Sequence, residues 1–401
     1  MDQPLSTRAL QPDELAIRGG TPVRPAALPP RVHITESIRD AMTRLIDSGS
    51  FSDWRGGRYV AKFEEAFAQW HGLDYHCVAV NSGTSALHLA CAALDIGPGD
   101  EVIIPCAAYV SAASAVVQMG GIPVVCDVDP GTLTMDVDDA AAKITRRTRA
   151  LMPVHFWGCA SDMTAIIELA DQHGLLVIED CGQSHGATAG GRLVGSFGDA
   201  SCYSFAPRKH ISTGQGGAIV TRDDGLASRA RDLANKGKGI GWLDYRELGF
   251  SYVMPEFEAL LGLNGLSQLD QEVASRRAAA AIYRDELAET GLRMWDDPGW
   301  GTHVYFKMPL GLSPGHAADL GWVVDAIHAE NVSCRPTHPP LSSISWLADY
   351  ADERGRPFSP ELQPNAYQSL PLIFEVETGP NMTADDVRTS ARAVRKVISA
   401  L

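Results

Sequence analysis

Lys209 lies in a stretch of sequence whose residue types suit chemistry at a single amine. The stretch starts with an apolar, strand-like run, Ser201–Phe205, and continues through a short polar turn that carries Lys209. The glycines of Gly214–Gly217 follow, and glycine lets a backbone approach a ligand closely. Earlier in the chain, the apolar run 175–178 leads to Asp180. We therefore expect a lysine and a carboxylate near the carboxyl ends of two buried strands.

This pair is what pyridoxal phosphate (PLP) chemistry requires. The amine forms a Schiff base, and the acid keeps the pyridine nitrogen protonated so that the ring accepts electrons. Ser82, Gly83 and Thr84 precede an apolar helix, whose amides and dipole would hold a phosphate. Taken singly, these features are most often an ordinary helix cap, a capping or metal-binding aspartate, and a solvated lysine. Their combination in one chain is far more specific, and it predicts a PLP site.

Composition narrows the classes of partner. The chain has 401 residues, 45% of them hydrophobic and 21% charged, and a formal net charge of −15. This acidity argues against nucleic acid or an anionic membrane as the main partner. No apolar stretch approaches the ~20 residues that span a bilayer. The first eighteen residues are polar and lack the apolar core of a signal peptide. We expect a cytoplasmic protein.

The cysteines and histidines do not indicate a metal site. The eight cysteines are scattered and form no CxxC pair, which favours reduced thiols in the core. His155 and His185 lie near strand ends without a second ligand at helical spacing. A structural or substrate-contact role is the better reading for both. The glycines of Gly214–Gly217 lack the GxGxxG spacing of a dinucleotide-binding turn.

Strands and helices alternate through the first part of the chain. Near-continuous apolar strands separated by helices predict an α/β fold with a seven-stranded, mostly parallel sheet covered on both faces. Ligands of such sheets bind outside the carboxyl ends of the strands. The expected strands are 77–80, 101–105, 122–126, 150–154, 175–178, 201–205 and 217–221.

The pattern changes after about residue 250. Long helices at 255–269 and 272–290, an alternating strand at 303–310, and a terminal amphipathic helix at 384–400 indicate a smaller C-terminal α+β domain. The predicted divisions are an N-terminal arm (1–30), a large PLP-binding domain (31–255) and a small domain (256–401). The proline-rich segment 22–31 is expected to lie extended on the body or on a partner subunit.

Several long motifs resemble the DegT/DnrJ/EryC1/StrS family of fold-type I PLP aminotransferases. They are Asn81–Ala90, Gly97–Pro105, Pro153–Gly158, Val177–Gly186 and Cys202–Lys209. The resemblance covers nearly the whole chain. It implies an enzyme that aminates a keto-sugar or keto-cyclitol, often for antibiotic biosynthesis. The opening Leu15–Val23 resembles the branch with aminocyclitol and aminohydroxybenzoate enzymes.

The resemblance also implies roles for single residues. Lys209 would bind the cofactor and shuttle the proton, and Asp180 would pair with the pyridinium nitrogen. Gln183 matches a contact on the hydroxyl side of the ring, and Tyr109 matches an aromatic ring stacked on the pyridine. The phosphate would be held by the turn Ser82, Gly83 and Thr84 together with Ser204.

Substrate contacts and assembly follow from the same resemblance. His185, Arg335 and His338 are candidate substrate contacts. A homodimer with active sites at the subunit interface is implied, in which an asparagine reaches the neighbouring phosphate. Here that run reads Gly249–Met254, with Ser251 in place of the asparagine and Val253 in place of an arginine. Ser251 reaches less far, which puts the cross-subunit contact in doubt.

The predicted function is amino transfer from L-glutamine or L-glutamate to a cyclic ketone. A keto-cyclitol such as an inosose, in aminocyclitol or antibiotic biosynthesis, is the favoured acceptor. A nucleotide-diphospho-keto-sugar is the alternative. Two rivals are a PLP-dependent sugar dehydratase, which in this family carries histidine instead of the lysine, and an inactive regulatory homologue.

Overall fold

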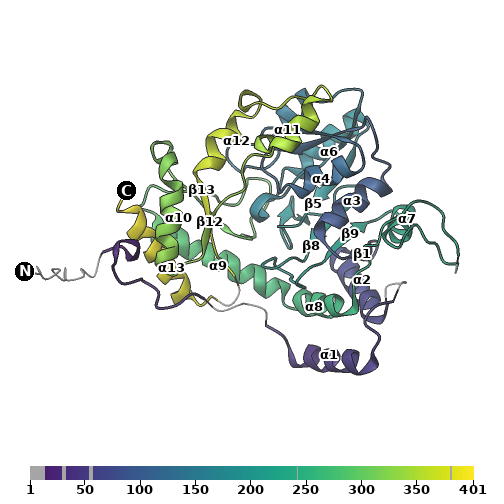
Figure 1. Cartoon of the computed structure of the whole chain (residues 1–401), viewed down its shortest axis with the longest axis horizontal. Helices are drawn as coiled ribbons and strands as arrows, with labels where there is room; N and C mark the ends of the chain where they lie inside the picture. Colours follow the sequence, from purple (N-terminus) through teal and green to yellow (C-terminus); the bar gives the residue numbers. More distant parts are fainter. Residues whose placement is uncertain (1–13, 29–32, 54–56, 242, 380–381) are drawn as a thin grey trace, which may run out of the picture.

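The larger sheet has seven strands in the order β1-β9-β8-β5-β4-β2-β3 (Figure 1). The computed structural model describes residues 14–28, 33–53, 57–241, 243–379 and 382–401. All neighbouring strands from β8 to β3 are parallel, whereas β9 runs antiparallel to both β8 and β1. The predicted mostly parallel seven-stranded sheet is thereby confirmed. Its strands are β1 (His76–Val80), β2 (Glu101–Pro105), β3 (Ile122–Cys126), β4 (Thr148–Leu151), β5 (Leu176–Asp180), β8 (Ala200–Ser204) and β9 (Gly217–Thr221).

Both faces of this sheet are buried, which explains why its strands are largely apolar rather than alternating. In β1, Val78 and Val80 belong to one core cluster, while Cys77 and Ala79 belong to the cluster on the opposite face. The flanking helices are α2 (Gly57–His71), α3 (Gly83–Ala93), α4 (Ser111–Gln118), α5 (Val137–Ala142), α6 (Met163–His173) and α7 (Asp224–Ala234). A two-stranded hairpin joins β6 (Thr188–Ala189) to β7 (Arg192–Leu193).

A second, antiparallel sheet forms the smaller α+β part, in the order β10-β11-β13-β12. Its strands are β10 (Arg293–Met294), β11 (Met308–Gly311), β12 (Cys334–Pro336) and β13 (Ile373–Val376). It shares a core with α10 (Leu320–Ala329) and α13 (Ala384–Ile398). Thr383 and Asp386 close the start of α13 with a reciprocal capping box. Two consecutive helices, α8 (Glu256–Leu266) and α9 (Leu269–Leu287), run along the base of the molecule, and α1 (Glu36–Ser48) lies below α8 (Figure 1).

The segment 303–310 was predicted as one strand, and this prediction is wrong for its first half. Only the part from Met308 onward belongs to β11. Tyr305 adopts a left-handed backbone conformation with φ 48°, which no strand residue has. Its neighbours instead bond to the larger part of the protein: Val304 donates to the carbonyl of Gly158, and Phe306 donates to that of Trp157. Tertiary contacts therefore override the alternating pattern here.

Segments near both ends of the chain pack on elements that are far away in the sequence. Near the N-terminus, Val23 donates its backbone N–H to Glu330, and Arg24 pairs with Asp386, so this part of the arm lies on the smaller sheet's helices. Toward the C-terminus, α11 (Ser345–Asp352) and α12 (Pro364–Ser369) lie over the larger sheet (Figure 1). Leu347 and Ala366 join its core cluster. The division of the chain into domains stays a prediction.

All eight cysteines are free and buried. Burial raises the pKa of every one of these thiols above its ordinary value. Within the described part of the chain, no helix has both the length and the apolar character needed to cross a membrane.

Candidate active site

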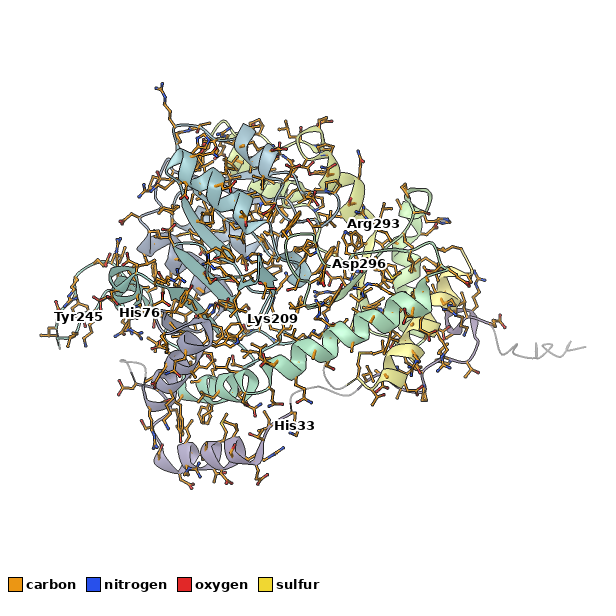
Figure 2. All side chains as sticks on the ribbon, turned by 180° about the vertical axis from the view of Figure 1, so that it is seen from behind. His33, His76, Lys209, Tyr245, Arg293 and Asp296 are labelled. Atoms are coloured by element: carbon orange, nitrogen blue, oxygen red, sulfur yellow. The ribbon has the colours of Figure 1, made fainter. Side chains whose placement is uncertain are left out.

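Lys209 lies in the turn that follows β8, between the larger sheet and α9 (Figure 2). The preceding residue, Arg208, has φ 75°, a left-handed conformation that costs free energy for a non-glycine residue. Two contacts stabilise this turn. The Arg208 side chain pairs with Glu377 at 3.4 Å, and its carbonyl accepts a hydrogen bond from Arg276, also at 3.4 Å.

The Lys209 amine lies over an aromatic ring in a desolvated site. Its Nζ is 4.4 Å from the ring centroid of Phe306. Burial lowers the pKa of Lys209 to about 8, although the Asp180 carboxylate acts in the opposite direction. Arg335 lowers this pKa further, and Glu375 raises it. A lysine with a pKa near the working pH can both accept and release a proton, which its usual pKa of about 10.4 would prevent.

Asp180 is the last residue of β5, which pairs in parallel with β8, the strand that leads to the Lys209 turn. The carboxyl ends of parallel strands meet at one edge, so the acid and the amine share that edge. Asp180 is 9% exposed, and its Oδ1 accepts a hydrogen bond of 2.9 Å from the Gly182 amide. Burial raises the pKa of Asp180, while the Gly182 bond and the charge of Lys209 oppose this rise. A cation bound beside Asp180 would add to these opposing effects and favour the charged form of the carboxyl group.

The ionisation of Lys209 can be measured without cofactor. In the PLP-free protein, labelling of Lys209 by an amine-acylating reagent should rise with pH around a midpoint of about 8. Asp180→Asn removes the charge that stabilises the ammonium form, so its midpoint should lie lower. Peptide mass spectrometry after brief labelling at a series of pH values gives both midpoints. A Lys209 midpoint near the ordinary lysine pKa of about 10.4 would contradict the prediction.

The start of α3 approaches β8 and β9 closely. Ser82 caps this helix, because its Oγ accepts a hydrogen bond of 3.0 Å from the Ser85 amide. A Cβ on Gly83 would lie 2.5 Å from the Cβ of Ser204, and a Cβ on Gly217 would lie 2.4 Å from the Ser82 carbonyl oxygen. Only glycine fits at these two positions. Thr84 is exposed in the first turn, where amides have no partner within the helix. The glycine contacts, Ser204 and these amides suit a phosphate group.

An aromatic pair and a glutamine lie on neighbouring elements. Tyr109 follows β2 and is 48% exposed, and its ring meets that of His338 edge-on with centroids 5.0 Å apart. Burial lowers the pKa of His338, so its neutral form is favoured. The Gln183 side-chain oxygen accepts a hydrogen bond of 2.8 Å from the amide of Trp157. The Tyr109 ring is therefore accessible to solvent, whereas the Gln183 side chain is fixed by its hydrogen bond to the Trp157 backbone.

Sequence reasoning missed two residues that organise this region, Trp157 and Glu375. Trp157 is buried in a left-handed conformation with φ 53°, and its indole N–H donates to Glu375 at 2.7 Å. Glu375 also accepts hydrogen bonds from Thr337 at 3.0 Å and from Arg335 at 2.8 Å. The available signal was a single glutamate inside the otherwise apolar strand β13, since glutamate is rarely buried unless it is paired.

Two other candidate site residues, His185 and Ser251, lie in environments that differ from each other. His185 is 0% exposed and lies among the rings of Tyr203, Phe205 and His210. Burial lowers its pKa to about 3, so it stays neutral. Ser251 is exposed in a segment that runs along β1, where Val253 bridges to Val80. Roles in substrate contact and in a cross-subunit contact stay predictions for these two residues.

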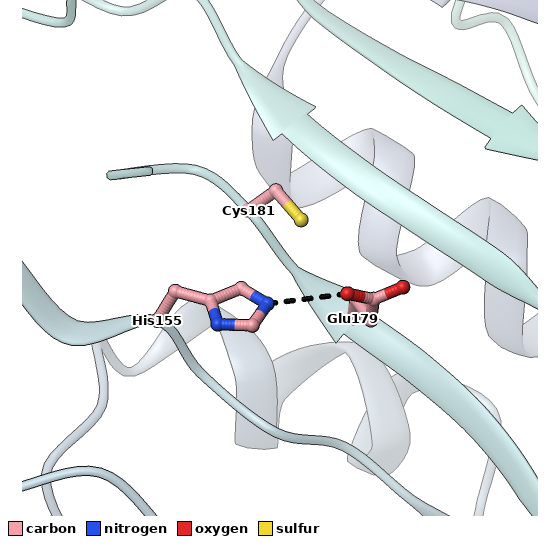
Figure 3. A group of neighbouring side chains, drawn as sticks. All are labelled: His155, Glu179 and Cys181. Carbon is pink, nitrogen blue, oxygen red and sulfur yellow. Dashed lines mark hydrogen bonds and ion pairs between the residues drawn. The ribbon is translucent and has the colours of Figure 1, made fainter. Parts of the chain in front are cut away.

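His155, Glu179 and Cys181 form a buried cluster (Figure 3). The Ser161 amide donates to Nδ1 of His155, so the ring proton is on Nε2, which donates to Glu179 at 3.3 Å. Glu179 also accepts hydrogen bonds from the amides of residues 195, 197 and 198. Burial alone would raise the pKa of Glu179, but these bonds hold it below its ordinary value. Because both nitrogens and the carboxylate are already used, we assign this cluster a structural role.

Glu179→Gln should therefore destabilise the protein. The amide cannot accept all the bonds that the carboxylate accepts, because its NH₂ group would face donors. We expect a loss of about 3 kcal/mol in the free energy of unfolding, in the range for a broken buried ionic contact. Urea unfolding at pH 7 measures it, with the exposed Glu168→Gln as the control. The difference should shrink as the pH falls through the folded-state pKa of Glu179. Equal midpoints for Glu179→Gln and the control would contradict this assignment.

Comparison with known proteins identifies the family. The DegT/DnrJ/EryC1/StrS aminotransferase family matches residues 32–395. The chain belongs to this family. It is 39% identical to GDP-perosamine synthase of Caulobacter vibrioides over 74% of this chain and 81% of that protein. It is 35% identical to L-glutamine:2-deoxy-scyllo-inosose aminotransferase of Streptomyces kanamyceticus, over 83% and 82%. The structure of S. venezuelae DesV in complex with a ketimine intermediate matches with TM-score 0.83 and 31% identity, over 91% and 95%.

The protein is thus a PLP-dependent aminotransferase, and its residues fit that cofactor. When bound, PLP supplies an aldehyde that captures amines and a ring that accepts electrons. Ser82, Gly83, Thr84 and Ser204 would hold its phosphate, and Asp180 would hold the ring nitrogen in its protonated form. Lys209, with its lowered pKa, would bind this cofactor and would accept and return a proton at the substrate carbon.

Proposed function

We propose that this aminotransferase moves an amino group from L-glutamine or L-glutamate to a cyclic ketone, and that the ketone is a keto-cyclitol such as an inosose. The observation that carries the proposal is the Lys209 amine, desolvated over Phe306 and sharing a sheet edge with Asp180. This arrangement supports proton transfer at a substrate carbon. The relative from S. kanamyceticus, named for an amino donor and an inosose, supports the choice of both partners.

The decisive experiment separates the donor step from the acceptor step. L-glutamine, added to the PLP-bound protein without any ketone, should bleach the yellow band of the bound cofactor. A keto-cyclitol added next should restore it, with release of an aminocyclitol that mass spectrometry identifies. A band that neither glutamine nor glutamate changes would overturn the assignment of the donor.

A nucleotide-diphospho-keto-sugar is the second candidate acceptor, supported by the similarity to GDP-perosamine synthase. If nucleotide-linked keto-sugars restore the band and keto-cyclitols do not, the second candidate replaces the first. Lys209 argues against the dehydratase rival, which carries histidine at this position, and a glutamine reaction would exclude an inactive homologue.

We also propose a homodimer whose active sites lie at the subunit interface, in an enzyme of the cytoplasm. Ser251 would approach the partner's phosphate site from its exposed position. Size-exclusion chromatography with light scattering tests the dimer. Ser251→Ala should weaken PLP binding if the contact is made, and an unchanged affinity would contradict it.

A further inference from the structure

His185 and His210 are neighbouring buried histidines beside Lys209. Their ring centroids lie 5.6 Å apart, and both side chains are buried. Among the residues that the structure describes, neither ring nitrogen of His185 has a hydrogen-bond partner, and Nδ1 of His210 has none either. Because buried polar groups almost always have a partner, these nitrogens indicate a site for a small hydrogen-bonding molecule.

The protonation of the two rings shows which molecule would fit. Nε2 of His210 donates a hydrogen bond of 3.2 Å to the carbonyl of Val304, so Nδ1 of the neutral ring is an acceptor. Burial lowers the pKa of both histidines, and the charges of Arg276 and Lys209 lower it further. Both rings are therefore neutral near pH 7. The site suits an uncharged molecule that can both donate and accept a hydrogen bond, and water is such a molecule.

Two aromatic rings that pack on His185 do not serve its nitrogens. Phe205 has no polar side-chain atom, and the hydroxyl group of Tyr203 donates to the carbonyl of Val194 at 2.9 Å. A water that accepts from the N–H of His185 and donates to Nδ1 of His210 would give each ring a partner. Two hydrogen bonds of about 2.8 Å each can join neighbouring rings at this separation.

A polar cavity brings solvent to this pair of rings. It has a volume of about 790 Å³, and His210 and Lys209 both line it. Arg208 lines it too, and its side chain is 59% exposed, so the cavity reaches the surface. Water from solvent can thus reach both His210 and the lysine. The remaining polar lining residues include Ser212, Asn264, Gln268, Gln271 and Ser275.

We propose that His185 and His210 bind an internal water that comes from this cavity, and that this water exchanges the protons of the Lys209 amine with solvent. In one exchange, an N–H bond of the Lys209 ammonium group breaks and its proton passes to the water oxygen. A proton of the water passes to the amine nitrogen in return, so the charge of each group is unchanged and both rings stay neutral. His185 and His210 are positioning residues, because they act through the water.

The water site is tested directly by a crystal structure of the PLP-bound protein. We expect a water within about 3.2 Å of Nδ1 of His210 and of one ring nitrogen of His185. Rings enclosed only by apolar atoms, with no density between them, would overturn the inference. Thermal unfolding of His185→Phe gives a second measurement. Phenylalanine would raise the Tm if it replaced nitrogens without partners, so we expect a Tm at or below that of the wild type.

Proton exchange is tested in a single turnover with L-glutamine that carries deuterium on its α-carbon. The mass of the aminated cofactor gives the fraction of deuterium that Lys209 has passed on rather than exchanged. This fraction should rise several-fold in His210→Phe, which cannot hold the water. His210→Asn keeps a polar atom near the position of Nδ1 and should return the fraction toward the wild-type value. A merely structural disruption would slow bleaching without raising this fraction.

The exposed His173→Phe is the matched control and should keep the wild-type fraction. Equal fractions in the wild type and in His210→Phe would overturn the role in proton exchange. The inference rests on the proposed function only for the choice of labelled donor. If the crystal structure shows the water but glutamine leaves the cofactor band unchanged, the water site stands and the proposed donor is wrong. The same label on whichever amino acid bleaches the band then measures the exchange.

Discussion

Lys209→Ala is expected to lower the rate of amino transfer by more than about 10⁴-fold, the upper range for loss of a positioned acid–base group. The loss should be this large because the same amine would both bind the cofactor and move the proton, and another buried amine, that of Lys307, is paired with Glu377. PLP should still bind weakly through the phosphate turn around Gly83. Single-turnover bleaching with glutamine measures the reaction with the amino donor, and steady-state product formation measures the complete amino transfer.

The exposed Lys62→Ala is the matched control and should retain the wild-type rate. Adding methylamine to the Lys209→Ala protein should recover a small part of the proton transfer, since a free amine can take the vacated place. Sustained turnover by Lys209→Ala without added amine would mean that another group carries the reaction.

Asp180→Asn is expected to lower the rate by about 10²- to 10⁴-fold, again within the range of acid–base effects. Asparagine has nearly the same shape, and its oxygen can still accept the bond from the Gly182 amide. It carries no charge, so it cannot hold the pyridine nitrogen protonated in a site from which water is excluded. The phosphate turn is untouched, and PLP should remain bound.

Stopped-flow absorbance after mixing with glutamine measures this rate, and equilibrium dialysis measures retention of PLP. The exposed Asp171→Asn is the control. A rate within about tenfold of wild type for Asp180→Asn would remove this carboxylate from the chemistry. Loss of PLP binding together with the rate would instead indicate that Asp180 acts mainly in holding the cofactor.

The sequence predicted those parts of the fold in which local pattern and tertiary context agree. β2, β3 and β9 have the predicted bounds, because each is a continuous apolar run buried on both faces. The strand predicted at 303–310 failed in its first half, where the backbone of residues 304 and 306 bonds to a segment far away in the sequence. Alternation alone carries no information about such a partner.

The site also contains residues that local sequence patterns predicted and residues that they did not. Asp180 and Lys209 each follow an apolar strand, so a local pattern pointed to both, and the parallel pairing of β5 and β8 then brings them to one edge. Glu375 stands out in the sequence only as a lone glutamate in an apolar run, because its partners, at positions 157, 335 and 337, come together only in the folded chain. The residues next to it in the sequence do not indicate the partners of a residue that acts through long-range hydrogen bonds.

The reactivity of the eight buried thiols can report local unfolding of the protein. Thiol reagents attack the thiolate, and burial both raises the thiol pKa and blocks access, so native protein should react slowly. The cysteines are spread from β1 to β12, and each becomes reactive only when its own segment opens. Mass spectrometry of singly labelled protein would thus rank the segments by local stability, with no engineered probe.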